Sequence, residues 1–157
     1  MNIRLEQATD LDAQAIFDLQ VAAFLPLLET YQDYATNPAN ETIDRVYQRI
    51  NYPNGRFFKI IAEDRLVGAI CILWKEDIHF RISPIFLAPN AQGNGFAQQA
   101  MRLAEARYPQ AETWELSSLL EETKTCQLYE KMGYVETCVR KPLNDNATLI
   151  HYQKIMA

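Results

Sequence analysis

Short apolar stretches along the chain are separated by segments in which apolar residues recur every three or four positions. Stretches of the first kind predict strands, and segments of the second kind predict amphipathic helices. The predicted strands cover residues 3–8, 56–62, 66–74, 78–87, 114–119, 134–140 and 148–155. The predicted helices run from residue 11 to near residue 26, and over residues 43–50, 96–108 and 121–132. Strands alternate with helices, and paired strands lie toward both ends, so we predict a three-layer α/β domain on a mixed sheet.

Prolines bear on two of these predicted elements. Pro26 is expected to break or kink the first helix, because proline lacks the amide hydrogen that a helix interior needs. Pro84 lies inside the strand predicted at residues 78–87 and cannot donate to a strand ladder, so it indicates a bulge or a strand edge. The alternative is that this strand simply ends at Ser83.

Length and charge narrow the class of protein. A chain of 157 residues suits one domain, taken here as residues 1–157. Lys and Arg number 15 against 20 Asp and Glu, a net charge of −5 that argues against nucleic-acid binding. A small phosphorylated ligand held by backbone amides stays compatible with this balance.

Other composition features predict a protein of the cytoplasm. The longest apolar run, residues 69–74, is too short to span a bilayer, and no secretory signal is visible, so no membrane partner is expected. Three scattered cysteines and two isolated histidines, His79 and His151, favour neither a disulfide framework nor a metal site.

A glycine-containing loop lies between the strand at residues 78–87 and the helix at residues 96–108. Gly93 and Gly95 would let backbone N–H groups converge where the helix dipole is positive, which makes a site for an anion. A dinucleotide-binding loop would need glycine at Gln98, and a Gly-Lys-Ser/Thr phosphate loop is absent. The alternative is a plain strand-to-helix turn that needs glycine only for its backbone angles.

Two motifs in order carry a family resemblance. Gln92, Gly95 and Ala97 in this setting resemble the acyl-CoA motif of the GNAT superfamily of N-acetyltransferases. Residues 128–134, Leu-Tyr-Glu-Lys-Met-Gly-Tyr, resemble the family's second signature, one strand and one helix downstream. The order of predicted elements is similar to the family's over nearly the whole chain. The resemblance implies a three-layer α/β/α fold on a mixed, largely antiparallel, splayed sheet, and transfer of an acetyl group from acetyl-CoA to an amine.

The resemblance also places the cofactor. Acetyl-CoA would lie along residues 82–87 with its pyrophosphate on the loop amides, and backbone N–H groups near Ile85 and Leu87 would bind the pantetheine arm and the thioester carbonyl. The carbonyl contact would stabilise the oxyanion that forms on attack. Relatives usually carry a basic residue in this loop, which is absent here between residues 82 and 101. No metal is expected, and the expected cofactor-binding residues are Ile85, Phe86, Leu87, Gln92, Gly93, Asn94, Gly95, Phe96 and Ala97.

The sequence indicates a general acid more clearly than it indicates a general base. Tyr129 stands in the family's general-acid position, so the resemblance implies that it protonates the departing thiolate, although it could instead merely pack in a buried stripe. The family's usual glutamate base is replaced by Arg81, which cannot accept a proton. Glu115 is the nearest acidic candidate for the base, and His79 or Ser83 acting through a water are others. Glu115 could equally be a solvated strand residue.

In the family's fold the acceptor pocket is walled by the first two helices, their loop and the strands near residue 114. Aromatic faces there would suit a cationic amine, so the expected acceptor is a small-molecule or peptide amine. A second copy of the chain, forming a homodimer, is a further expected partner. The rival hypothesis is a non-catalytic sensor or regulatory module that binds acyl-CoA. The candidate pocket residues are Phe24, Tyr31, Tyr34, Trp74, Arg81 and Trp114.

Overall fold

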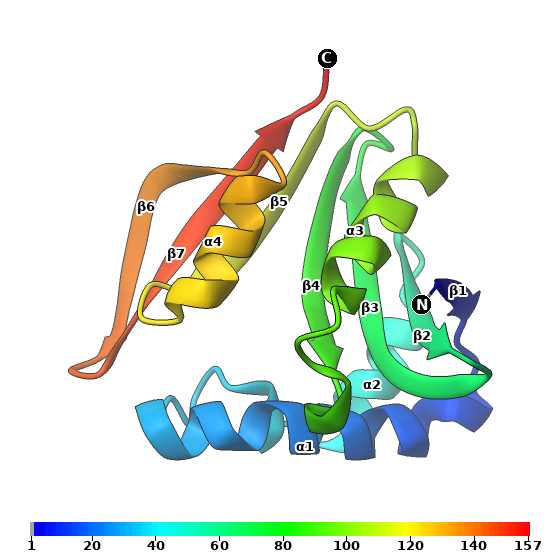
Figure 1. Ribbon diagram of the computed structural model, residues 1–157, viewed down its shortest axis with the longest axis horizontal. Helices are drawn as coiled ribbons and strands as arrows, with labels where there is room; N and C mark the ends of the chain where they lie inside the picture. The colour runs from blue at the N-terminus through cyan, green and yellow to red at the C-terminus, as the bar shows by residue number, and fades with distance from the viewer. Residues whose placement is uncertain (1) are drawn as a thin grey trace.

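A computed structural model describes residues 2–157, and within that range seven strands form one sheet flanked by helices (Figure 1). The strands are β1 (Ile3–Gln7), β2 (Gly55–Ala62), β3 (Arg65–Lys75), β4 (His79–Leu87), β5 (Thr113–Leu119), β6 (Val135–Asn144) and β7 (Ala147–Ile155). The helices are α1 (Ala13–Tyr31), α2 (Ile43–Ile50), α3 (Phe96–Arg107) and α4 (Thr123–Lys131), with short 3₁₀ turns η1 (Asp10–Asp12), η2 (Pro38–Asn40) and η3 (Pro89–Ala91).

The sheet is mixed and largely antiparallel, as predicted. Its order is β1-β2-β3-β4-β5-β7-β6, and β4 with β5 is the parallel pair among the described strands. That pair is also the shortest, because its register covers only residues 79–81 of β4 against residues 113–115 of β5. Beyond Arg81 and Glu115 the two strands separate (Figure 1).

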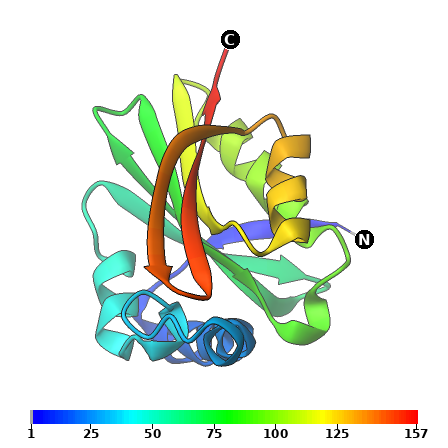
Figure 2. The same cartoon turned by 90° about the vertical axis from the view of Figure 1, so that its left-hand side faces the viewer.

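Two hydrophobic clusters lie on opposite faces of the sheet and confirm the three layers. One cluster joins α1 and α2 to the sheet through buried residues that include Ile16, Val46 and Phe86. The other packs α3 and α4 against the opposite face and includes Met101 and Trp114. Figure 2 shows α3 and α4 together on one side of the curved sheet.

The bulge expected at Pro84 is present. Ile70 pairs with Ile85 and Ile72 pairs with Ile82, so β4 carries one residue more than β3 between these two pairs. An extra residue bends a strand and increases its twist, which turns the end of β4 away from β5. The strand therefore continues to Leu87 and does not end at Ser83.

The first helix is longer than the sequence pattern predicts. α1 runs through Pro26 to Tyr31, so the expectation that the helix ends near Pro26 was wrong. Proline removes one helix hydrogen bond, but the turn that follows is fastened by the Thr30 hydroxyl, which donates to the Pro26 carbonyl at 2.9 Å. Burial of Leu28 adds an apolar contact beyond the proline, and Gln32 closes the helix in a left-handed conformation.

The stretch Asp10–Tyr31 has the length and apolar character of a membrane-crossing helix. In this fold α1 buries Ala13 and Ile16 against the sheet and α2. The core helix of a globular domain has the same length and composition, so these two properties are weak evidence for a membrane span.

Candidate active site

The loop before α3 presents its backbone amides. Gly93 and Gly95 have φ values of +82° and +76°, and a Cβ at either would meet nothing within 4 Å, so the surrounding space is open. The side chains of Gln92 and Asn94 fold back onto the loop and donate to the carbonyls of Leu87 and Ala91, at 3.2 and 3.1 Å. Unbonded N–H groups at the start of a helix attract anions. An open amide cradle fits a pyrophosphate, with the two amide side chains bracing the loop.

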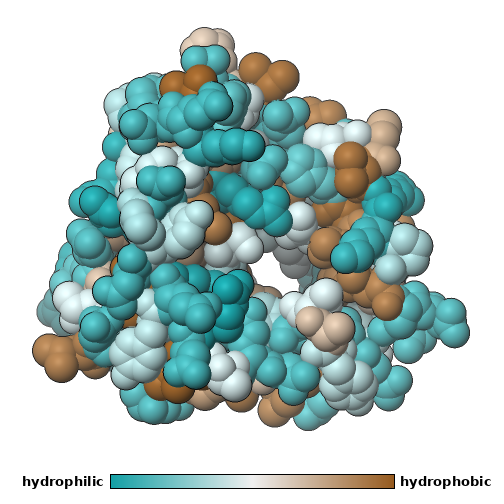
Figure 3. All heavy atoms as spheres, turned by 180° about the vertical axis from the view of Figure 1, so that it is seen from behind, coloured by the Kyte–Doolittle hydropathy of each residue, from teal (hydrophilic) through white to brown (hydrophobic). Residues whose placement is uncertain are grey.

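The separation of β4 from β5 leaves one edge of β4 without a strand partner. From residue 82 onward, the β5-facing N–H and C=O groups of β4 have no ladder with β5. The space-filling view from behind shows an opening through the molecule at this place, above α1 (Figure 3). A ligand that enters from the α3 and α4 face can therefore reach the opposite face, and can hydrogen-bond to β4 as a missing strand would.

Tyr129 lies on α4, which packs over β5 (Figure 1). Its side chain is buried, and its ring packs at a tilt against Tyr134 and edge-on against Tyr152, at centroid distances of 6.3 and 6.0 Å. Burial raises the pKa of Tyr129 to about 12. Among residues 2–157 its hydroxyl has no protein hydrogen-bond partner. The phenol thus keeps its proton at neutral pH and is free to donate it.

Glu115 sits where the paired part of β5 ends, held between two basic side chains. One carboxylate oxygen accepts from Arg81 at 3.2 Å, and the other lies 3.1 Å from Nε2 of His151 on β7. A carboxylate has no proton to give, so Nε2 is the donor. The Nδ1 atom of the same ring contacts the Thr137 hydroxyl at 2.9 Å, and Arg81 also reaches the Ser117 hydroxyl at 3.4 Å. Glu115 is therefore a fixed member of a polar network rather than an isolated surface carboxylate.

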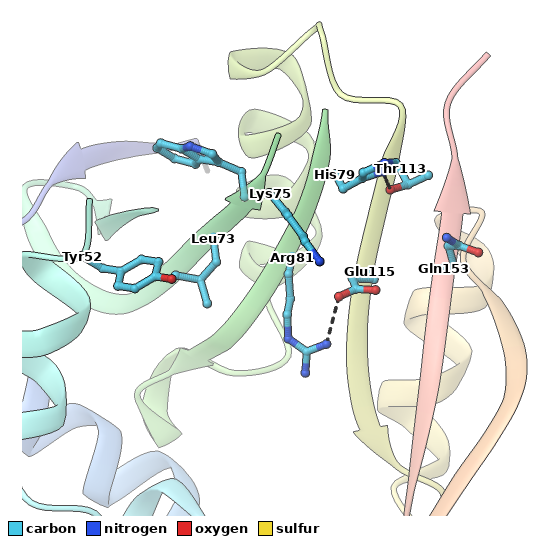
Figure 4. A pocket seen from close by; sticks show the side chains of 9 residues that line it. Tyr52, Leu73, Lys75, His79, Arg81, Thr113, Glu115 and Gln153 are labelled. Carbon is cyan, nitrogen blue, oxygen red and sulfur yellow. Dashed lines mark hydrogen bonds and ion pairs between the residues drawn. The ribbon is translucent and has the colours of Figure 1, made fainter. Parts of the chain in front are cut away.

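A pocket of about 440 Å³ opens beside this network, on the face of the sheet opposite Trp114. Figure 4 shows Lys75 and Arg81 pointing into it, with Arg81 reaching from β4 toward Glu115 on β5. His79 is fixed at its rim by a contact of 2.8 Å between Nδ1 and the Thr113 hydroxyl. The lining residues are Tyr52, Leu73, Trp74, Lys75, His79, Arg81, Thr113, Glu115 and Gln153.

Only part of the predicted acceptor pocket comes together. Trp74 and Arg81 line the pocket, whereas Tyr34 is 59% exposed on the loop after α1. Phe24 packs edge-on against Phe86, at a centroid distance of 5.8 Å. Tyr31 donates to Glu122 at 2.6 Å, which ties the end of α1 to the loop before α4.

Trp114 requires a correction, because its side chain is 0% exposed and cannot line a pocket. It belongs to the core beneath α3, where its ring packs against Phe80 at a centroid distance of 5.0 Å. Side chains of a strand alternate between faces, so Trp114 and Leu116 point into the core while Thr113, Glu115 and Ser117 point away from it.

The same alternation is the signal that could have found the missed pocket residues on β5. Polar residues at every second position of residues 113–117 predict one polar face beside a parallel neighbour. Tyr52, Lys75 and Gln153 carry no such signal, because they reach the pocket from other segments of the chain. Within residues 2–157, no group of three His, Cys, Asp or Glu side chains is placed to hold a metal ion.

Comparisons with solved structures agree with this fold. Two solved structures of similar fold are the ribosomal-protein-S18-alanine N-acetyltransferase from Escherichia coli and the spermidine N-acetyltransferase from Vibrio cholerae in complex with CoA and spermine. The first has a TM-score of 0.80 at 14% identity, covering 99% of this chain and 96% of that chain. The second has a TM-score of 0.77 at 20% identity, covering 98% and 95%. An acetyltransferase from Thermus thermophilus has a TM-score of 0.75 at 16% identity, covering 99% and 98%.

At these identities the likeness establishes the fold, and no curated protein matches the chain in sequence. The family is shown by a separate match. The family model for the Acetyltransferase (GNAT) family matches residues 14–134, which include both motifs and every strand from β2 to β5. The chain therefore belongs to the GNAT family of acetyltransferases.

Proposed function

We propose that the protein transfers the acetyl group of acetyl-CoA to a primary amine by direct attack within a ternary complex. The observation that carries the proposal is the separation of β4 and β5 beyond Arg81 and Glu115. The loop with the amide cradle follows the free end of β4, and the polar pocket lies beside the paired end at Arg81 and Glu115. Figure 3 shows an opening through the molecule. Two substrates entering from opposite faces can meet only at this opening.

The cradle and the free edge of β4 suit the acetyl donor. Backbone amides of residues 93–97 hold the pyrophosphate, helped by the dipole of α3. N–H groups on the free edge of β4 bind the pantetheine arm and the thioester carbonyl. When the amine attacks, negative charge develops on that carbonyl oxygen, and an N–H already aimed at it lowers the barrier.

Two side chains move the protons of the reaction. An alkylammonium must lose a proton before it can attack, and Glu115 at the mouth of the opening accepts it. The nitrogen then forms a bond to the acetyl carbon, the carbon–sulfur bond breaks, and Tyr129 protonates the departing thiolate. The products are an N-acetylated amine and free CoA.

A second candidate function is a sensor that binds acyl-CoA without turnover. The observation in its favour is that both carboxylate oxygens of Glu115 are already engaged, by Arg81 and by His151. In that case the cradle would bind acetyl-CoA but no amine would be acetylated.

Titration calorimetry with acetyl-CoA, followed by thiol release across a panel of amines, tests both functions. Binding together with amine-dependent thiol release is the result expected of the enzyme. Binding without release for any amine supports the sensor, and the absence of binding contradicts both.

The proposed homodimer rests on β6, an edge strand that leaves Val135 and Val139 largely exposed. Light scattering of the purified protein tests it, and a monomer at every concentration would contradict it.

A further inference from the structure

The charges that line the pocket differ from those expected of a site for a polyamine. Lys75 and Arg81 contribute two positive charges and Glu115 contributes the one carboxylate among the lining residues. The pocket is therefore locally cationic, although the chain as a whole carries a net charge of −5. A flexible ligand with several positive charges would be repelled here, whereas an anionic group would be attracted.

Arg81 and Glu115 form a matched pair at the mouth of the opening. Their side chains are 36% and 38% exposed, so both can be reached by a ligand, and their charged atoms are 3.2 Å apart. The guanidinium uses one N–H on Glu115 and one on Ser117, which leaves further donors available. A ligand that carries an ammonium and a carboxylate side by side presents the two opposite charges in the complementary arrangement.

The Arg81–Glu115 pair lies where a bound amine would meet the thioester. Arg81 and Glu115 are the last residues of the paired part of β4 and β5, and the strands separate immediately beyond them. An ammonium held by Glu115 would lie at the edge of the opening through which the thioester arrives, with its carboxylate turned toward Arg81 and Lys75 (Figure 4). His151 donates to the second oxygen of Glu115 and holds the carboxylate in place from β7.

We propose that the acceptor is an amine with a carboxylate one carbon away, a free α-amino acid, and that Arg81 binds this carboxylate. The inference rests on the proposed function and narrows its substrate. Because a bidentate Arg–carboxylate contact is strong, loss of the carboxylate is expected to lower kcat/KM by roughly 10-fold or more.

The test compares each of a set of L-amino acids with its carboxamide and with the amine left after decarboxylation, in thiol release with the full chain. The free acid is expected to be the best acceptor of its set. In Arg81→Gln the ratio of kcat/KM between acid and carboxamide is expected to fall to within about 2-fold. Arg4→Gln is the matched control, because Arg4 is an exposed strand arginine, paired with Glu6 and Asp64, on a distant strand.

Three outcomes would overturn the inference. Decarboxylated amines or spermidine could be better acceptors than the acids, Arg81→Gln could leave the acid-to-carboxamide ratio unchanged, or Arg4→Gln could change it equally. If no amine is turned over, calorimetry of the same ligands in the presence of CoA decides. Preferential binding of the acid that is lost in Arg81→Gln supports the anion site while the transferase function fails, and equal or absent binding overturns the anion site.

Discussion

Tyr129 combines two properties at a single residue, a raised pKa and a hydroxyl without a protein hydrogen-bond partner among residues 2–157. Burial favours the neutral phenol, which raises its pKa to about 12. A general acid must hold its proton until the leaving group needs it, and a CoA thiolate is basic enough to take a proton from a nearby phenol. By contrast, the hydroxyls of its neighbours Tyr134 and Tyr152 donate hydrogen bonds to Glu105 and Glu130.

Replacing Tyr129 by phenylalanine removes the proton donor and keeps the ring. We expect kcat to fall by roughly 100-fold, because general acid catalysis contributes about that much, while binding of acetyl-CoA persists. Tyr134→Phe is the matched control, since it removes a hydroxyl from the same aromatic cluster and should leave kcat nearly unchanged. Thiol release at saturating substrate measures both, and equal turnover by Tyr129→Phe and the unaltered protein would refute the general-acid role.

Alkaline pH should destabilise the fold, because two tyrosines have raised pKa values in the folded state. The hydrogen bond to Glu122 raises the pKa of Tyr31 to about 12, as burial does for Tyr129, against an ordinary value of 10. The folded state holds these protons more tightly than the unfolded chain does. The stabilisation they provide is therefore complete below pH 10 and is lost as the pH rises from 10 through 12.

Urea unfolding over that alkaline range measures the effect. The buried Tyr129 alone is expected to account for a decrease of ~2–3 kcal/mol in the free energy of unfolding. Tyr129→Phe should flatten the curve, and an identical pH dependence in this variant would contradict the assignment.

At the scale of elements, the junction of β4 with α3 owes its anion-binding form to backbone conformation. Gly95 caps α3 in the left-handed region, which costs other residues roughly 1–2 kcal/mol. The loop contains no cation, and its two amide side chains brace it from within.

Gly95→Ala should weaken acetyl-CoA binding more than it weakens the fold. The methyl group meets no protein atom, but it enters the open space before the amides and strains the cap. We expect the Kd for acetyl-CoA to rise, by roughly 10-fold for each ~1.4 kcal/mol of binding free energy that the substitution removes. Gly133→Ala places similar strain, at φ +96°, at the end of α4 and serves as the control. Calorimetry on both variants separates the effects, and equal losses of affinity would contradict a role for the cradle.

The lack of a loop cation has a consequence for salt dependence. Amides and a helix dipole act over one turn, so added salt should lower the affinity for acetyl-CoA only modestly. Calorimetry at low and moderate ionic strength measures this. A steep loss of affinity would mean that distant cations such as Arg102 or Lys131 hold the phosphates.

Sequence patterns were least informative where an element depends on its neighbours. Pro26 predicts the end of α1, yet the helix continues because contacts beyond the proline outweigh one lost hydrogen bond. β6 likewise runs past its predicted end to Asn144 through Pro142, which an edge strand tolerates because one side of its backbone has no ladder to satisfy.

At the scale of the whole molecule, an opening connects the two faces of the sheet. No cysteine is suited to carry the acetyl group as a covalent intermediate. Burial raises the pKa of Cys71 to about 12, which keeps its thiol protonated and unreactive. Cys126 is a buried residue of α4, and Cys138 is exposed on β6 at the far edge of the sheet.

Initial-rate kinetics should therefore show a sequential mechanism. Double-reciprocal plots at several amine concentrations are expected to intersect, because donor and acceptor must be bound together. Intact-mass spectrometry after incubation with acetyl-CoA alone should find no acetylated protein. Parallel lines together with an acetylated protein would contradict direct transfer.

The sequence by itself determined the strand and helix order, the glycine loop and the place of Tyr129, because periodicity, backbone freedom and short motifs are local properties. Tertiary structure alone decided which side chains meet. The register of β4, β5 and β7 brings Arg81, Glu115 and His151 into one network, and the alternation of β5 sends Trp114 into the core. A shift of one residue in either register would reverse those faces, so a pattern read along the chain could not anticipate a cationic pocket in an acidic protein.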